Sequence, residues 1–122
     1  MVSCSQKVTF LQSAVVPAAE GRVKIDKDAN NNYSVDVFLE NLAPPSRLTP
    51  PKKAYVVWAE TDQNGTVNLG QLRTSNSWRS SSLEASLKTV TPYKPVRVVV
   101  TAEDQPNLRT PGFQTVIMTK KF

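Results

Sequence analysis

Apolar and polar residues alternate with a period of two along most of this chain. Residues 35–40 read VDVFLE, and residues 96–103 read VRVVVTAE. Because successive side chains of a β-strand point to opposite faces, this alternation is typical of half-buried antiparallel strands. Similar stretches, rich in Val, Thr, Ile, Phe or Tyr and bounded by turn residues, are 7–16, 21–26, 54–61, 66–73, 83–89 and 112–119. The pattern predicts an all-β fold of about seven to eight strands.

The segment SSSLEASLKTV, at residues 80–90, is the most ambiguous of these elements. A serine ahead of an acidic residue is a helix-start signal, so one helical turn is an alternative. No stretch of the sequence carries a convincing 3.6-residue period, and we therefore assign this segment as a strand.

Two connections indicate how the strands are joined. The pair Asn64-Gly65 lies between strand-like runs and suits the positive φ of a tight turn, which predicts a hairpin of residues 54–61 with 66–73. The segment APPSRLTPPKK holds four of the nine prolines, which remove backbone donors, and is expected to cross in extended form to another element. Short strands with frequent turn signals favour an immunoglobulin-like antiparallel β-sandwich, with a partly closed barrel as the alternative.

The length of 122 residues suits one domain with one ordinary core. We expect an N-terminal lead over residues 1–6 and a single sandwich domain over residues 7–122. No run approaches the roughly 20 apolar residues of a membrane-spanning helix. The single cysteine cannot form an internal disulfide.

The chain is basic, with 15 Lys and Arg against 10 Asp and Glu and a net charge of +5. Such a balance raises nucleic acid as a partner. The positions argue against it, because the cations at 22–27 lie among acidic residues, and the doublets at 52–53 and 120–121 are far apart. We expect no nucleic-acid partner, and a cationic domain over anionic lipid fits this charge at least as well.

The stretch YVVWAETDQNGTVNLGQL, at residues 55–72, resembles the extracytoplasmic domain of anti-sigma-K factors. An aromatic residue and an apolar pair precede Trp58, a polar turn follows, and the next strand ends in Leu69, Gly70 and Gln71. The stretch VRVVVTAEDQPNLRTPGFQTVIMT continues the similarity, which covers about residues 33–119. The resemblance implies a sandwich fold and an extracytoplasmic address. Those factors also carry a sigma-binding segment and a transmembrane helix, which this sequence lacks, so we do not expect it to sequester a sigma factor by itself.

Cys4, the only cysteine, follows Val2 and Ser3. These three residues match the last positions of a bacterial lipobox, in which the cysteine receives lipid after a signal peptide is removed. Each buried lipid methylene contributes about 0.8 kcal/mol, so two or more acyl chains would hold a sandwich at a membrane. The alternative is a free thiol on a frayed terminus. We expect lipidation at Cys4 and a periplasmic or cell-surface, membrane-anchored lipoprotein.

Familiar enzyme chemistry finds little support in the sequence. It contains no histidine, which removes the commonest general base and the usual nitrogen ligand of zinc. The four glycines are isolated, so no glycine-rich phosphate loop is present. Glu60 and Asp62 could act as paired carboxylates, but such residues at an exposed strand end are more often solvated. We expect no catalytic residue, no cofactor and no enzyme.

The segment DKDANNNYS is a candidate calcium loop, because Asp26, Asp28 and Asn30 occupy alternate positions and Asn31 stands where a turn glycine is usual. The twelfth position is Val37 instead of a bidentate Glu, and strands flank the loop. A hairpin loop of turn-forming residues is the favoured alternative.

The two tryptophans have different surroundings. Trp58 lies in an apolar strand and is expected to fill the core between the sheets. Trp78 lies in the polar segment RTSNSWRSSS, which also holds Arg73 and Arg79. We favour Trp78 as an anchor of this loop, with a stacking contact to a ligand as the alternative.

Together these features predict a non-enzymatic interaction or structural module of a bacterial envelope, whose partner is an unknown envelope protein or a glycan. Two alternatives remain: a sensory or regulatory component beside a separate sigma-regulating protein, and a weak calcium- or carbohydrate-binding module.

Overall fold

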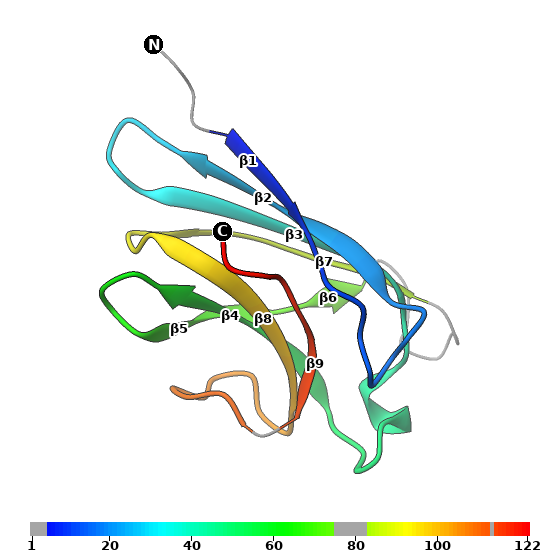
Figure 1. The fold of residues 1–122 in the computed structure, drawn as a ribbon. Helices are drawn as coiled ribbons and strands as arrows, with labels where there is room; N and C mark the ends of the chain where they lie inside the picture. Colours follow the sequence, from blue (N-terminus) through cyan, green and yellow to red (C-terminus); the bar gives the residue numbers. More distant parts are fainter. Residues whose placement is uncertain (1–4, 75–82, 113) are drawn as a thin grey trace.

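The computed structural model describes residues 5–74, 83–112 and 114–122 and shows two antiparallel β-sheets packed face to face (Figure 1). The five-stranded sheet contains, in spatial order, β1 (Ser5–Thr9), β2 (Glu20–Lys27), β3 (Tyr33–Leu42), β7 (Leu83–Thr91) and β6 (Arg73–Thr74). The four-stranded sheet contains β5 (Thr66–Gln71), β4 (Ala54–Thr61), β8 (Pro95–Glu103) and β9 (Thr115–Met118). The all-β sandwich predicted from the alternation is confirmed.

The strand order is that of an immunoglobulin-like sandwich. The series β2-β3-β7-β6 and β5-β4-β8-β9 reproduce the two sheets of that fold, and β1 is an additional edge strand beside β2. The described residues thus form nine strands, of which β6 has only two residues.

The proline-rich segment 43–53 carries the chain from β3 in one sheet to β4 in the other, which confirms the predicted crossing, but the segment is not extended throughout. It contains the short 3-10 helix η1 (Pro45–Arg47). The Tyr55 hydroxyl donates a hydrogen bond to the Ala43 carbonyl at 2.6 Å and holds the start of this segment against β4. In the described part of the chain, no helix is long and apolar enough to cross a membrane.

The predictions for the ambiguous segment 80–90 and for the hairpin at Asn64-Gly65 are confirmed. The segment at residues 80–90 contributes β7, which pairs with β3 from Tyr33↔Thr91 onward. The predicted hairpin of β4 and β5 also forms. Its turn is longer than expected, because the Thr61 N–H donates to the Gly65 carbonyl at 2.9 Å and, in the turn, only Gly65 takes a positive φ, of 67°.

The N-terminal strand lies earlier in the chain than the sequence indicated. Ser5 and Gln6, which we assigned to the lead, belong to β1 and pair with Asp26 and Ile25 of β2. The strand predicted over 7–16 ends at Thr9 because the chain then crosses to the other sheet. There Leu11 N–H donates to Met118 O at 2.8 Å, and the buried Ser13 hydroxyl donates to the Val116 carbonyl. Residues 10–16 therefore cover the edge of β9.

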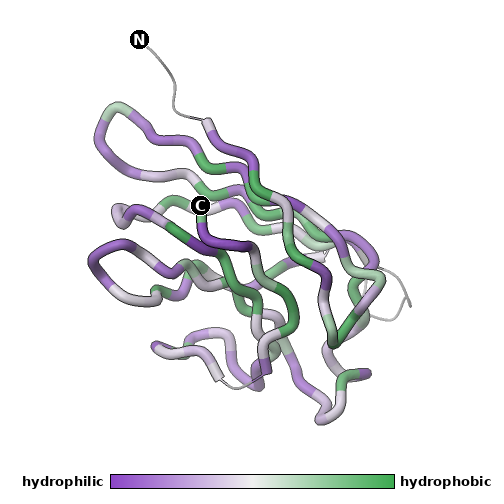
Figure 2. Tube along the Cα trace, in the orientation of Figure 1, coloured by the Kyte–Doolittle hydropathy of each residue, from purple (hydrophilic) through white to green (hydrophobic). Residues whose placement is uncertain are grey.

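The main core lies between the sheets, and each strand contributes its inward-facing residues. Figure 2 shows hydrophobic positions recurring along the strands, with hydrophilic positions at several of the connecting turns. The central members from the five-stranded sheet are Val23, Ile25, Val35, Val37 and Leu39, and those from the four-stranded sheet are Tyr55, Val57, Ala59, Val98 and Val100.

A second apolar cluster lies on the outer face of the four-stranded sheet and contains Trp58. The expectation that Trp58 fills the core between the sheets is wrong. Tyr55, Val57 and Ala59 occupy the inward positions of β4, so the two-residue period places Trp58 on the opposite face. Trp58 is nevertheless fully buried, because Leu108 of the β8–β9 connection packs on this cluster together with Met118.

Candidate functional site

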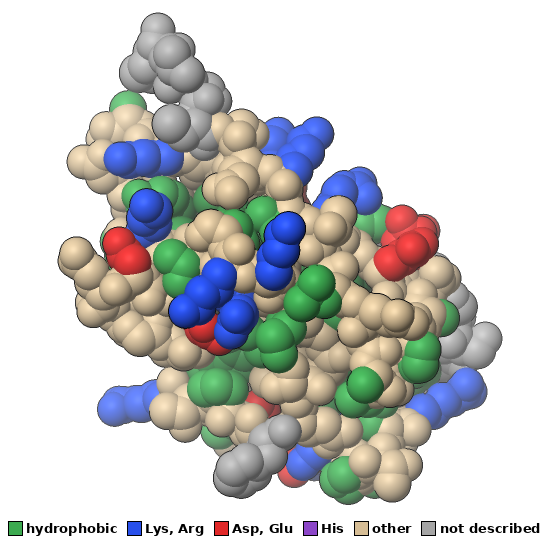
Figure 3. Space-filling view, viewed as in Figure 1, with side chains coloured by type: hydrophobic (Ala, Val, Ile, Leu, Met, Phe, Trp, Pro, Cys, Tyr) green, Lys and Arg blue, Asp and Glu red, His purple; other side chains and the backbone are tan. Residues whose placement is uncertain are grey.

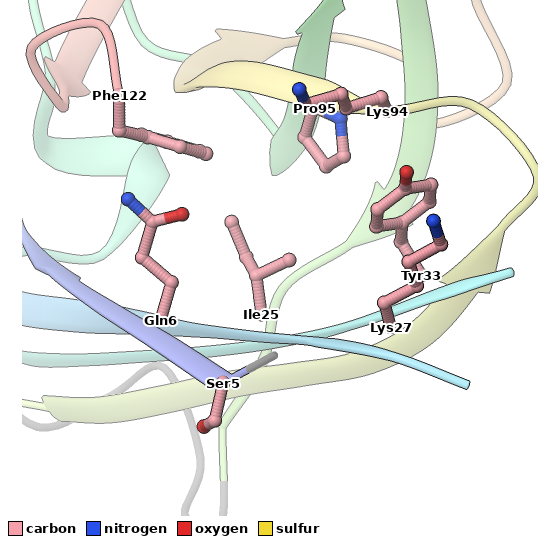
Figure 4. Close-up of a pocket in the computed structure, with 8 residues that line it drawn as sticks. All are labelled: Ser5, Gln6, Ile25, Lys27, Tyr33, Lys94, Pro95 and Phe122. Atoms are coloured by element: carbon pink, nitrogen blue, oxygen red, sulfur yellow. The ribbon is translucent and has the colours of Figure 1, made fainter. Parts of the chain in front are cut away.

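A pocket of about 520 Å³ opens between the two sheets at one end of the sandwich (Figure 4). This end carries the β2–β3 and β7–β8 turns and the beginning of β1. Its lining residues are Ser5, Gln6, Ile25, Lys27, Tyr33, Lys94, Pro95 and Phe122. The pocket is therefore built by residues from both ends of the sequence and from both sheets.

Strand register determines which side chains face this pocket. Gln6 pairs with Ile25, and Lys27 pairs with Tyr33. In Figure 4, Ile25 stands at the centre, with Phe122 and Pro95 opposite it, while the Ser5 hydroxyl points away. Gln6 and Lys27 thus line the open end of the space between the sheets, and farther inside the sandwich apolar core residues fill that space.

The pocket combines an apolar floor with positive charge. Ile25 is 6% exposed and belongs to the main core. The Lys27 Nζ lies 6.0 Å from the centroid of the Tyr33 ring, at the outer range of a cation–π contact. The eight lining residues include Lys27 and Lys94 and no acidic side chain. Figure 3 shows Lys and Arg side chains around exposed hydrophobic surface on this side of the molecule.

Neither lysine of the pocket forms an ion pair with a described residue. The ion pairs in these parts of the chain are Lys24–Asp26, Lys52–Asp104 and Arg97–Glu60. An unpaired ammonium beside an apolar floor attracts an anion more strongly than one in open water, because the effective dielectric constant is lower there. The arrangement is therefore suited to binding an anion, which the two lysine ammonium groups would orient.

A series of buried side-chain hydrogen bonds lies on the outer face of the four-stranded sheet, the face turned away from the core. The Trp58 indole Nε1 donates to Thr101 Oγ1, which donates to Glu103 Oε2, and the same oxygen accepts the Gly112 N–H. Asn68 Nδ2 additionally donates to the carbonyl of Leu108 at 2.9 Å. These bonds fasten the β8–β9 connection over Trp58, and they give Glu103 a structural role.

Three of the residues that the sequence suggested as sites lie outside the described residues: Cys4, Trp78 and Arg79. Arg73 is described; it is exposed on β6 and pairs with Ser86 of β7. The suggested contact of Trp78 with a ligand stays a prediction.

The candidate calcium loop is the β2–β3 turn. Asp28 Oδ1 accepts the backbone N–H groups of Asn30 at 2.8 Å and Asn32 at 2.9 Å, and Asn31 takes a φ of 63°. Asp26 instead forms a 4.0 Å ion pair with Lys24. Within the described ranges, no group of three or more Asp, Glu, Cys or His side chains gathers as a metal site. Turn formation accounts for these residues, and calcium binding by Asp26, Asp28 and Asn30 stays a prediction.

Glu60 and Asp62, considered as a pair, make separate contacts in the structure. Glu60 lies 3.4 Å from Arg97 Nη1 across β4 and β8. Asp62 lies in the β4–β5 turn, where its backbone N–H donates to the Lys94 carbonyl at 3.2 Å.

Comparison with family models, with curated proteins and with solved structures gave no match. The functional argument therefore depends on the fold and on the geometry of the pocket. Of the resemblance to anti-sigma-K factors, the structure supports the two-sheet all-β fold.

Proposed function

We propose that this chain is a non-enzymatic binding domain of a bacterial envelope, held at a membrane surface by lipid on Cys4. The lipobox-like residues Val2, Ser3 and Cys4 support the lipid attachment. The observation that carries the proposal is the start of β1 at Ser5, directly after Cys4. With so short a spacer, a lipid-bearing Cys4 holds the pocket end of the sandwich close to the membrane.

The side chains at this end support the same orientation. Lys27 and Lys94 line the pocket there, and Val90 and Tyr93 are 61% and 38% exposed in or beside the β7–β8 turn. Lysine attracts anionic headgroups, and tyrosine suits the boundary between apolar and aqueous layers. An extracytoplasmic surface also agrees with the resemblance to anti-sigma-K factors.

The test is expression of the complete gene in a bacterial host, followed by fractionation, intact mass and mapping of the N-terminus. We expect a diacylglyceryl-modified Cys4 as the first mature residue and recovery with membranes. Cys4→Ser should release the protein, whereas Ser3→Ala, which keeps a small residue before the cysteine, should leave the lipid in place. A soluble, unmodified chain that still begins before Cys4 would overturn the tether.

A regulatory role beside a separate sigma-regulating protein is the second candidate, and the stretch around Trp58 that resembles anti-sigma-K factors favours it. Deletion of the gene should then change transcription from promoters that depend on the partner sigma factor. Unchanged transcription, with no gene for such a regulator nearby, would remove this candidate and leave the envelope binding domain.

A further inference from the structure

We infer that the pocket between the sheets binds an amphipathic anion, a small molecule with an apolar body and a carboxylate or phosphate head. This inference depends on the pocket residues alone and holds whether or not Cys4 carries lipid.

The shape and floor of the pocket suit the apolar body. Its volume of about 520 Å³ lies within the range of small-molecule sites, roughly 300–1,000 Å³. Ile25 comes from the five-stranded sheet, and Pro95 and Phe122 approach it from the other layer (Figure 4). Because Ile25 is part of the main core, an apolar group inserted here extends that core and loses its contact with water.

The inward-facing polar residues explain why the sandwich is open at this end. Large apolar side chains would close the space between the sheets, but β1 places Gln6 and β2 places Lys27 at this level. An amide and a flexible lysine can both reach the head of a ligand while their stems line its body.

The charge of the lining determines the sign of the ligand. Lys27 and Lys94 carry the only charged side chains of the lining, and neither forms an ion pair with a described residue. A carboxylate or phosphate would accept charge-assisted hydrogen bonds from these ammonium groups. A cationic head on the same apolar body would be repelled.

The experiment is an NMR titration that compares heads on one eight-carbon body: octanoate, octyl phosphate, octanol and octylammonium, each below its micelle concentration. The chain has two isoleucines, Ile25 in the pocket and Ile117 elsewhere in the core, so methyl labelling gives a reporter with an internal control. We expect a saturable shift of Ile25 with octanoate, octyl phosphate or both, and about tenfold weaker binding of octylammonium. Preference between the two anions identifies the head.

A matched pair of double variants tests the lysines. Lys27→Gln with Lys94→Gln should weaken anion binding about tenfold, whereas Lys7→Gln with Lys88→Gln, which removes the same charge from exposed positions on β1 and β7, should not. Equal effects of the two double variants would overturn the inference. So would the absence of a saturable Ile25 shift, equal binding of octylammonium, or an equal response to acetate and inorganic phosphate alone. The comparison of heads decides the matter in the native sequence if the pocket variant does not fold.

Discussion

The indole Nε1 of Trp58 donates a 2.8 Å hydrogen bond to Thr101 Oγ1, which joins two neighbouring strands on the outer face of the four-stranded sheet. The Thr101 hydroxyl in turn donates a hydrogen bond to Glu103 Oε2 at 2.7 Å, and the Gly112 N–H donates to the same oxygen at 2.7 Å. Trp58 and Thr101 are fully buried and Glu103 is 6% exposed. The outer face is thus closed by a loop that a carboxylate holds in place.

Thr101→Val should destabilise the protein by about 2–4 kcal/mol. Valine has the same shape, but it leaves the buried Trp58 N–H without its acceptor and Glu103 without one of its donors, and each unpaired group costs about 1–3 kcal/mol. Urea unfolding measures the change. Thr9→Val, on an exposed position of β1, is the control and should change stability by less than about 0.5 kcal/mol. Equal effects of the two substitutions would contradict the structural role of the network.

Gly112→Ala should destabilise by about 1–3 kcal/mol through a clash with the same carboxylate. A Cβ at Gly112 would lie 2.6 Å from Glu103 Oε1, and two hydrogen bonds restrain that side chain. The exposed Thr110 of the same connection provides the control substitution Thr110→Ala. If both variants unfold at the same urea concentration as the native protein, Glu103 moves freely and does not anchor the loop.

The alternation of side chains predicted the sandwich because strands such as β2 and β3 bury one face and leave the other accessible to water. It could not place Trp58, because β4 reads AYVVWAET and is apolar on both faces. The face covered by Leu108 and the face covered by the other sheet both require apolar residues, so the sequence of β4 does not distinguish them. The covering loop is set by contacts between residues distant in the chain, such as the bonds from Asn68 to Pro106 and Leu108.

The pocket was also hidden in the sequence. Its residues span positions 5 to 122, and only strand register brings Gln6, Lys27 and Phe122 to one end of the sandwich. A usable signal was nevertheless present: Gln6 occupies an inward position of β1, two residues before the buried Val8. A polar residue at an inward position indicates where a sandwich is open.

Tyr55 predicts a loss of stability in alkali. Burial raises the pKa of Tyr55 above its ordinary value near 10, because the fully buried ring disfavours the phenolate. Above about pH 10 the unfolded chain loses this proton while the folded chain keeps it, so the free energy of unfolding should fall by up to about 1.4 kcal/mol per pH unit. The stabilisation is complete below that pH. Urea unfolding on both sides of pH 10 measures this slope.

Tyr55→Phe is the matched variant. It should reduce the alkaline slope and cost about 1 kcal/mol at neutral pH, because the 2.6 Å hydrogen bond to Ala43 is lost. Tyrosinate absorbance gives a second measurement. The alkaline absorbance change of the unfolded chain should fall by about one third, since the chain has three tyrosines, while that of the folded protein stays the same. A smaller alkaline absorbance change in the folded variant would show that Tyr55 ionises in the folded state, which would contradict the prediction.

Gly21→Ala should be the most damaging of the glycine substitutions, at about 3 kcal/mol or more. Gly21 pairs with Leu39 near the start of β2, and a Cβ there would lie 2.1 Å from the Phe38 carbonyl oxygen and 2.9 Å from Leu39 Cα. Backbone atoms of a paired strand cannot move aside as a side chain can, so we expect loss of pairing at this end. Gly65→Ala is the comparison, because its Cβ meets nothing within 4 Å and only the φ of 67° opposes it, at a cost of about 1–2 kcal/mol. Urea unfolding of both variants measures the two losses of stability, and amide exchange at Val37 and Leu39 reports on the pairing of β2 with β3. A smaller loss of stability for Gly21→Ala than for Gly65→Ala would contradict the prediction.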